Sequence, residues 1–134
     1  MQFSSIRIIT ADNHRLVQFY ELVTGMTLTQ HTDDFAELRT PSVTLAIAST
    51  RTSPLFGNNQ VVTAASNRSV IIEFRVNDVD ADYEKLVDIL GESVIQKPTT
   101  MPWGNRSFLF RDPDGNLVNF FTPVTAESLK RADE

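Results

Sequence analysis

The sequence predicts an α+β fold in which two βαβββ repeats pair their sheets into one curved, cup-like mixed sheet. The first observation is that a strand, a capped helix and three short strands occur twice in the same order. The second is that the copies align, because Asp12 and Asp78 are 66 residues apart, as are Gly25 and Gly91. The third is length: one repeat is too small to bury its own sheet face, whereas 134 residues suit a single domain.

The first repeat is expected over residues 1–49. Residues 3–10 are rich in β-branched side chains and partly alternate in polarity, which predicts a strand. Asp12 is a suitable N-cap for the helix that follows, and Gly25 is a suitable C-cap. Turn residues then separate three further predicted strands, at 27–31, 34–39 and 43–48.

The second repeat is expected over residues 69–123. It begins with a strand at 69–76 and continues with a helix from Asp78 to Gly91. Three strands follow, at 93–96, 107–111 and 116–121, and the turn Asp112-Pro113-Asp114-Gly115 joins the last two. Toward the end of each repeat the predicted offset grows to 74, which places Val43 opposite Leu117 and Leu45 opposite Asn119.

The remaining segments are a connection at 50–68 and a tail at 124–134. The connection is rich in Ser, Thr, Asn and Gly, which is typical of a linker, although its Leu55-Phe56 pair could enter a cleft. The tail from Thr125 predicts a short, exposed helix.

Composition excludes several classes of protein. The formal net charge is −5 and the basic residues are scattered, which argues against nucleic-acid binding. With no cysteine, the chain cannot form zinc fingers, iron–sulfur clusters or disulfides. Its apolar runs are too short for a membrane span, and its N-terminus has no apolar signal core. We therefore expect a cytoplasmic protein.

Three stretches carry a resemblance to a known superfamily. They are Phe19-Tyr20-Glu21-Leu22-Val23-Thr24-Gly25-Met26, Glu73-Phe74-Arg75-Val76-Asn77-Asp78-Val79-Asp80-Ala81, and Trp103-Gly104 followed by residues 108–118, which include Asp112-Pro113-Asp114-Gly115-Asn116. The chain resembles the vicinal oxygen chelate superfamily, the group of glyoxalase I, bleomycin-resistance proteins and ring-cleaving dioxygenases. The resemblance implies the paired βαβββ fold inferred above, and it implies a homodimer.

The same resemblance implies four strand positions at which His, Glu or Gln would hold a divalent metal. Counted from the matching motifs, these positions fall on Ser5, Leu45, Ile71 and Asn119. Leucine and isoleucine have no donor atom, and neutral serine and asparagine oxygens bind such metals weakly. We therefore expect no metal and no other cofactor, and we interpret the two histidines, His14 and His31, as surface residues.

Arg7 and Glu73 are the charged candidates for the cup. Alternation from Ser5 and Ile71 puts both on the cup face of their strands, at equivalent places in the two repeats. A structural ion pair is one interpretation, because an unpaired buried charge is costly. In the other interpretation they recognise a polar group of a ligand, or Glu73 acts as a base.

Aromatic residues are candidates for the walls of a ligand cleft. Trp103 offers a large rigid surface for a planar ligand, and otherwise would be a core or interface residue. Asn119 would offer a polar amide at the floor of the cup. The aromatic and apolar residues that would complete the cleft are Phe35, Phe56, Met101, Phe108 and Phe121.

Two functions of different classes follow from these patterns. The first is a metal-free protein that binds a small organic ligand, possessing no catalytic residue and sequestering a planar or cationic compound, as antibiotic-resistance members of the superfamily do. The alternative is a divergent lyase, isomerase or dioxygenase, which would hold a metal differently or use Glu73 for acid–base chemistry. A third interpretation is an interaction module whose own side chains fill the cup.

Overall fold

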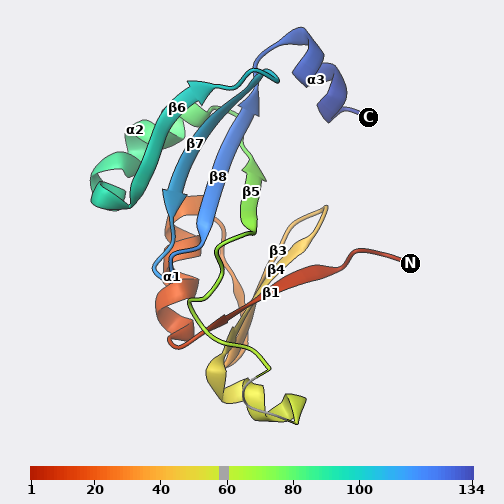
Figure 1. The fold of residues 1–134 in the computed structure, drawn as a ribbon, viewed down its shortest axis with the longest axis vertical. Coiled ribbons are helices and arrows are strands. Elements are labelled where there is room, and N and C mark those ends of the chain that lie inside the picture. The colour runs from red at the N-terminus through yellow and green to blue at the C-terminus, as the bar shows by residue number, and fades with distance from the viewer. Residues whose placement is uncertain (58–60) are drawn as a thin grey trace. The chain divides into compact units, whose positions relative to one another are not determined.

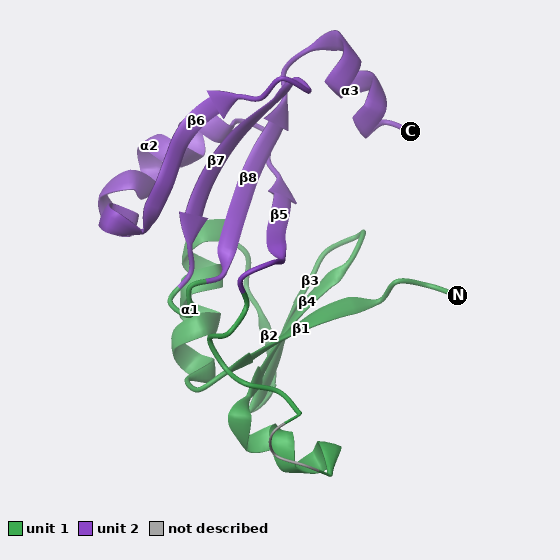
Figure 2. Ribbon diagram, viewed as in Figure 1, with its two compact units in different colours: residues 1–67, 113–115 green, residues 68–112, 116–134 purple. Residues whose placement is uncertain are grey.

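The computed structural model describes residues 1–57 and 61–134, which form two compact units. The first unit comprises residues 1–67 with 113–115, and the second comprises residues 68–112 with 116–134 (Figure 2). Each unit contains one four-stranded mixed sheet and a long helix, so the predicted α+β class is confirmed. Residues 58–60 of the predicted connection lie outside the described residues.

The first unit has the predicted βαβββ order. Its sheet has the strand order β1-β4-β3-β2, in which β1 and β4 are parallel and the other pairs are antiparallel. Its elements are β1 (Ser5–Thr10), α1 (Asn13–Thr24), β2 (Thr29–Thr32), β3 (Phe35–Arg39) and β4 (Thr44–Ser49).

The second unit repeats this topology, with the strand order β5-β8-β7-β6 and one parallel pair, β5 with β8 (Figure 1). Strand β6 is longer than predicted, because pairing with β7 continues to Thr100. The elements are β5 (Ile71–Arg75), α2 (Val79–Leu90), the short 3₁₀ helix η2 (Gly91–Ser93), β6 (Val94–Thr100), β7 (Asn105–Arg111), β8 (Leu117–Pro123) and α3 (Ala126–Ala132).

Strand register corrects the predicted alignment of the two repeats. Ser5 pairs with Thr44 in the first sheet, and Ile71 pairs with Leu117 in the second. The offset between β4 and β8 is therefore 73 and not 74, so Ala46 is the equivalent of Asn119 and the prediction for Leu45 is wrong. The physical reason is the strand register, which pairs Leu45 with Ile6 and Leu38, on the face opposite to Ala46.

One face of each sheet packs on its long helix and forms the core of the unit. In the first unit this core includes Leu16 and Tyr20 of α1 and Leu38 and Ile47 of the sheet, none more than 1% exposed. In the second, the rings of Phe108, Phe110 and Phe120 contact one another, and Phe108 meets Tyr83 of α2 edge to face. Phe108 is 0% exposed, so its predicted place in an aromatic cleft is wrong.

The helix caps agree with the sequence prediction. Asp12 accepts a hydrogen bond from the backbone N–H of Arg15, and Asp78 accepts one from Ala81, each at 3.1 Å. Gly25 ends α1 in the left-handed region, with φ of 69°, which suits a residue without a Cβ. Gly91 ends α2.

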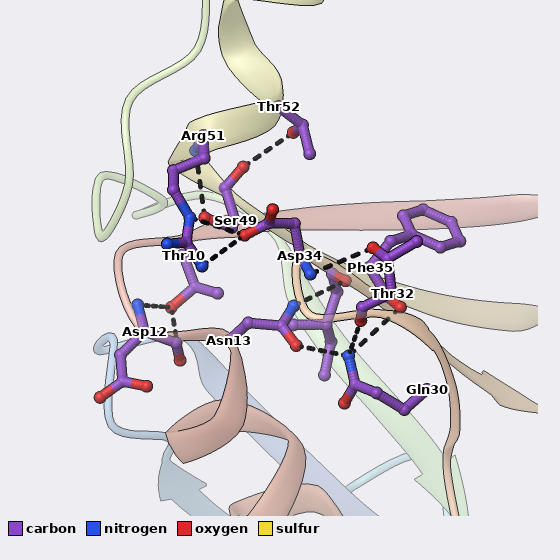
Figure 3. Close-up of polar contacts among 11 residues, drawn as sticks. Thr10, Asp12, Asn13, Gln30, Thr32, Asp34, Phe35, Ser49, Arg51 and Thr52 are labelled. Carbon is purple, nitrogen blue, oxygen red and sulfur yellow. Dashed lines mark hydrogen bonds and ion pairs between the residues drawn. The ribbon is translucent and has the colours of Figure 1, made fainter.

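A polar network ties α1 to its sheet (Figure 3). Asn13 is buried, donates to the carbonyl of Ile47 at 3.1 Å, and accepts from Gln30 at 3.0 Å. Nearby, the N–H of Ser49 donates to the carbonyl of Asp34 at 2.8 Å, and the Asp34 carboxylate accepts from Arg51 Nε at 2.7 Å. These bonds satisfy polar groups at the point where β1 passes into α1 and β4 passes into the connection.

Part of the predicted linker is ordered as the 3₁₀ helix η1 (Thr50–Phe56). Ser49 caps it by accepting from the N–H of Arg51 at 3.0 Å, a local bond that the composition of the segment did not suggest. Throughout the described ranges, 1–57 and 61–134, helices are too short or too polar to span a membrane.

The predicted C-terminal helix is present as α3, which is held against the β6–β7 turn. Its N-cap Thr125 and Ser128 form a reciprocal capping box. The Ser128 hydroxyl also donates to the carbonyl of Gly104 at 2.9 Å. Gly104 has a positive φ of 92°, and a Cβ at this position would lie 2.0 Å from Thr125 Oγ1, so only glycine allows this contact.

Candidate functional site

The face of the second sheet opposite α2 carries the polar candidates. Phe74 and Phe120 contact each other on the helix side. Because side chains alternate along a strand, the neighbours of these residues point to the other face, which we call the open face of the second sheet. It carries two adjacent rows of paired residues, Glu73–Asn119–Leu109 and Arg75–Phe121–Ser107.

Glu73 and Asn119 form a hydrogen-bonded pair in the first of these rows. Asn119 Nδ2 donates to Glu73 Oε2 at 2.8 Å, which fixes the orientation of the amide. Asn119 is only 8% exposed, and its Oδ1 atom is buried without a hydrogen-bond partner among the described residues. A buried carbonyl oxygen of this kind costs free energy, because it has given up its bonds to bulk water.

A cavity of about 270 Å³ adjoins the second row, under α3. Strands β5, β7 and β8 form one side of it through Arg75, Asn105 and Phe121. Helix α3 forms the other side through Ser128, Arg131 and Ala132. The cavity therefore combines two guanidinium groups with an aromatic ring.

Both arginines of the cavity have weak or partial partners within the chain. Arg75 Nη1 lies 4.0 Å from Asp133 Oδ1, at the limit of an ion pair, and the Asp133 side chain is 77% exposed. Arg131 donates from Nη2 to the carbonyl of Trp103. A guanidinium has five N–H donors, and among the described residues Arg131 uses one of them in this bond.

The structure brings three of the predicted site residues together, namely Glu73, Asn119 and Phe121. Trp103 lies in the β6–β7 turn, 57% exposed, and Phe56 ends η1, 42% exposed. Arg7 belongs to the first unit, where its guanidinium carbon lies 5.3 Å from the centre of the Phe35 ring. Its pairing with Glu73, which lies in the second unit, stays a prediction.

Sequence reasoning missed a charged cluster on the equivalent face of the first sheet. His31 Nε2 lies 2.7 Å from Glu37 Oε1, and Arg39 Nη2 donates to the same oxygen at 2.9 Å. The hydrogen bonds from Arg39 and His31 lower the pKa of Glu37 below its ordinary value of 4.5. Strict alternation along β3, in which Ala36 and Leu38 are buried, is the signal that could have found Glu37.

Comparisons with known proteins agree with this geometry. A family model described as Glyoxalase/Bleomycin resistance protein/Dioxygenase superfamily matches residues 2–120. The chain belongs to this superfamily. A search of the curated proteins gives no match.

Solved structures similar to the superfamily member described here include three bacterial proteins. A glyoxalase/bleomycin resistance protein/dioxygenase from Nocardioides shares 24% identity over 94% of this chain and 85% of its own, with a TM-score of 0.75. A glyoxalase/bleomycin resistance protein/dioxygenase family enzyme from Burkholderia phytofirmans shares 20% identity over 92% of this chain and 100% of its own, with a TM-score of 0.79. A glyoxalase-related enzyme from Fulvimarina pelagi shares 18% identity over 95% of this chain and 94% of its own, with a TM-score of 0.75. At these identities the likeness establishes the fold.

The residues of this member do not fit the divalent metal that its superfamily implies. With the corrected register the four expected positions are Ser5, Ala46, Ile71 and Asn119. Two of these side chains are hydrocarbon, and Ser5 and Asn119 offer only neutral oxygens, which bind such metals weakly. No group of three His, Asp or Glu side chains in the described part of the chain could hold a metal ion.

Proposed function

We propose that this superfamily member binds a small organic molecule on the open face of its second sheet, without a metal ion at the usual positions. The observation that supports the proposal is the buried, unpartnered Oδ1 atom of Asn119 beside the Glu73 carboxylate. Native proteins rarely leave such an atom unsatisfied, and ligand sites are a common exception. A homodimer and a cytoplasmic location are further parts of this proposal.

The chemistry of the site favours a planar ligand with a protonated amine. Asn119 Oδ1 would accept an N–H of the ligand, and Glu73 would supply a negative charge next to it. Phe121 lies two residues further along β8 on the same face and offers an apolar wall for a ring. The net charge of −5 adds a modest attraction for cations.

Calorimetric titration with benzylamine tests the proposal on the full chain. Replacing the amide by an apolar side chain of similar size, Asn119→Leu, removes the acceptor, so binding should weaken by about tenfold or more. Asn77→Leu makes the same change at an exposed residue between β5 and α2 and should bind like the parent. Equal affinity in all three proteins would contradict the proposal.

Metal content provides a second and independent test. Protein purified without a metal-binding tag and without chelator should contain less than stoichiometric Ni, Zn, Mn or Fe. A stoichiometric metal that chelator removes together with benzylamine binding would instead support the enzymatic alternative. In the metal-free form of that alternative Glu73 is a base, and Glu73→Gln would abolish turnover while preserving ligand binding.

A further inference from the structure

The cavity under α3 indicates which second chemical group the ligand carries. Glu73 and Arg75 are two residues apart on β5, as are Asn119 and Phe121 on β8, and all four point to the open face of the second sheet. At about 3.3 Å per residue, the two rows are about 7 Å apart. One small molecule can therefore contact both rows at once.

The two rows differ in charge. The first offers acceptors, the Glu73 carboxylate and the Asn119 oxygen, whereas the cavity beside the second offers the guanidinium groups of Arg75 and Arg131. Two cations lining one cavity repel each other until an anion lies between them. A planar carboxylate matches the fork of N–H donors that a guanidinium presents.

The Asp133 carboxylate partly balances the positive charge of the cavity. Its carboxylate reaches Arg75 only at 4.0 Å, and it lies just beyond the last residue of α3. An exposed pair at this distance contributes little stability, so a ligand carboxylate that reaches both guanidinium groups can replace it. The rest of the cavity wall suits a carbon skeleton, through the Phe121 ring and the Ala132 methyl group.

We propose that the cavity is a carboxylate subsite, and that the ligand is a flat amino acid-like molecule whose amine and carboxylate lie at opposite ends of a ring. The proposal rests on the function proposed above, which supplies the amine subsite. The carboxylate is a second group of the ligand, which the amine subsite alone does not require. The opposite substituents of a benzene ring are separated by a distance similar to the spacing of the two rows.

Three probes separate the two subsites by titration calorimetry. Benzylamine carries the amine, benzoate carries the carboxylate, and 4-(aminomethyl)benzoate carries both. The third should bind at least tenfold more tightly than either of the others, because a single molecule then uses both subsites.

Variants assign each group to its residues. Arg75→Gln and Arg131→Gln should each weaken the binding of 4-(aminomethyl)benzoate and of benzoate by about tenfold, and neither should weaken the binding of benzylamine. Lys97→Gln removes a positive charge at an exposed position of β6 and should leave the affinities for all three probes unchanged. Asp133→Asn should strengthen benzoate binding two- to threefold, since it removes the internal competitor for Arg75.

The outcomes distinguish the two proposals. Benzoate that binds equally to the parent and both arginine variants, or that fails to bind the parent, would overturn the carboxylate subsite even if Asn119→Leu still weakens benzylamine. Conversely, benzoate binding that depends on Arg75 and Arg131, with benzylamine binding absent, would support the carboxylate subsite and overturn the amine subsite. Circular dichroism melts of every variant check that the second unit remains folded.

Discussion

The two units share one topology and differ in how they satisfy the charges on their open faces. The central row of the first sheet is Arg7–Ala46–Glu37, and that of the second is Glu73–Asn119–Leu109. In the first, Glu37 is bound by His31 and Arg39 of its own unit. In the second, Asn119 keeps a buried oxygen without a partner. The same framework thus carries a carboxylate held by a histidine and an arginine in one copy and a carboxylate held by a neutral amide in the other.

The units also differ in how they hold their helices. In the first, the Asn13 side chain reaches the Ile47 carbonyl of β4. In the second, the equivalent residue is Val79, whose backbone N–H donates to the Thr122 hydroxyl of β8 at 3.1 Å. The polar side chain that joins helix to sheet has moved from the helix to the strand, so different residues stabilise the same junction.

The largest expected effect is a difference in stability between substitutions on the two faces of β8. Phe120→Ala removes a ring that is 1% exposed and contacts three other rings, which should lower the free energy of unfolding by about 3–5 kcal/mol. The next residue offers a matched control, because Phe121 faces the cavity and is only partly buried. Phe121→Ala should lower the free energy of unfolding by about 1 kcal/mol. Urea unfolding measures both, and equal losses would refute the assignment of the two faces.

A smaller effect should separate the two helix junctions. Asn13→Ala leaves the Ile47 carbonyl without its side-chain donor and removes one acceptor of Gln30, which keeps its bonds to the Thr32 and Phe35 carbonyls, at a cost of about 1–3 kcal/mol. Thr122→Val removes the acceptor for Val79 but lies where water has better access, so about 1 kcal/mol is expected. Thermal and urea unfolding of both variants measure the two losses of stability. A larger loss for Thr122→Val than for Asn13→Ala would contradict the prediction.

The smallest effect concerns acid and the charged cluster of the first unit. The pKa of Glu37 is lowered in the folded chain by its hydrogen bonds to Arg39 and His31, so its stabilising contribution is full above the ordinary value of 4.5 and is lost as the pH falls through the lower folded value. Glu37→Gln should therefore reduce the melting temperature at neutral pH, and this difference should shrink as the pH falls below 4.5.

Solvent limits this contribution to less than about 1 kcal/mol. Glu84→Gln, an exposed carboxylate on α2, serves as the control and should leave the pH profile unchanged. A Glu37→Gln protein whose acid profile overlays that of the parent would show that the three side chains do not interact in solution.

Local sequence signals predicted most of the fold. Asp12, Gly25 and Asp78 fix helix ends through bonds to residues a few positions away, and such bonds can be inferred from spacing alone. The register of β4 against β8 could not be inferred to the residue, because Leu45 and Ala46 are both apolar and both buried, and only strand pairing distinguishes them.

The candidate site was predicted only in part, for a similar reason. Glu73 and Asn119 lie 46 residues apart and meet because β5 and β8 are parallel neighbours, a pairing that the repeat alone does not specify. Arg131 and Ser128 reach the cavity through the packing of α3 on the sheet, and no periodicity in the tail encodes that packing. Phe108 shows the opposite failure, since alternation alone did not settle which face of β7 it occupies.

The contact between Gly104 and the Thr125–Ser128 cap has a consequence for the wall of the cavity. Half of the lining residues belong to a helix of seven residues, which packs on β8 and bonds to the β6–β7 turn. Exchanging Arg131 and Ala132 while keeping Ser128 would replace much of that wall and leave the bond to Gly104 in place. This helix is therefore the part of the cavity wall that can vary while the duplicated sheets stay the same.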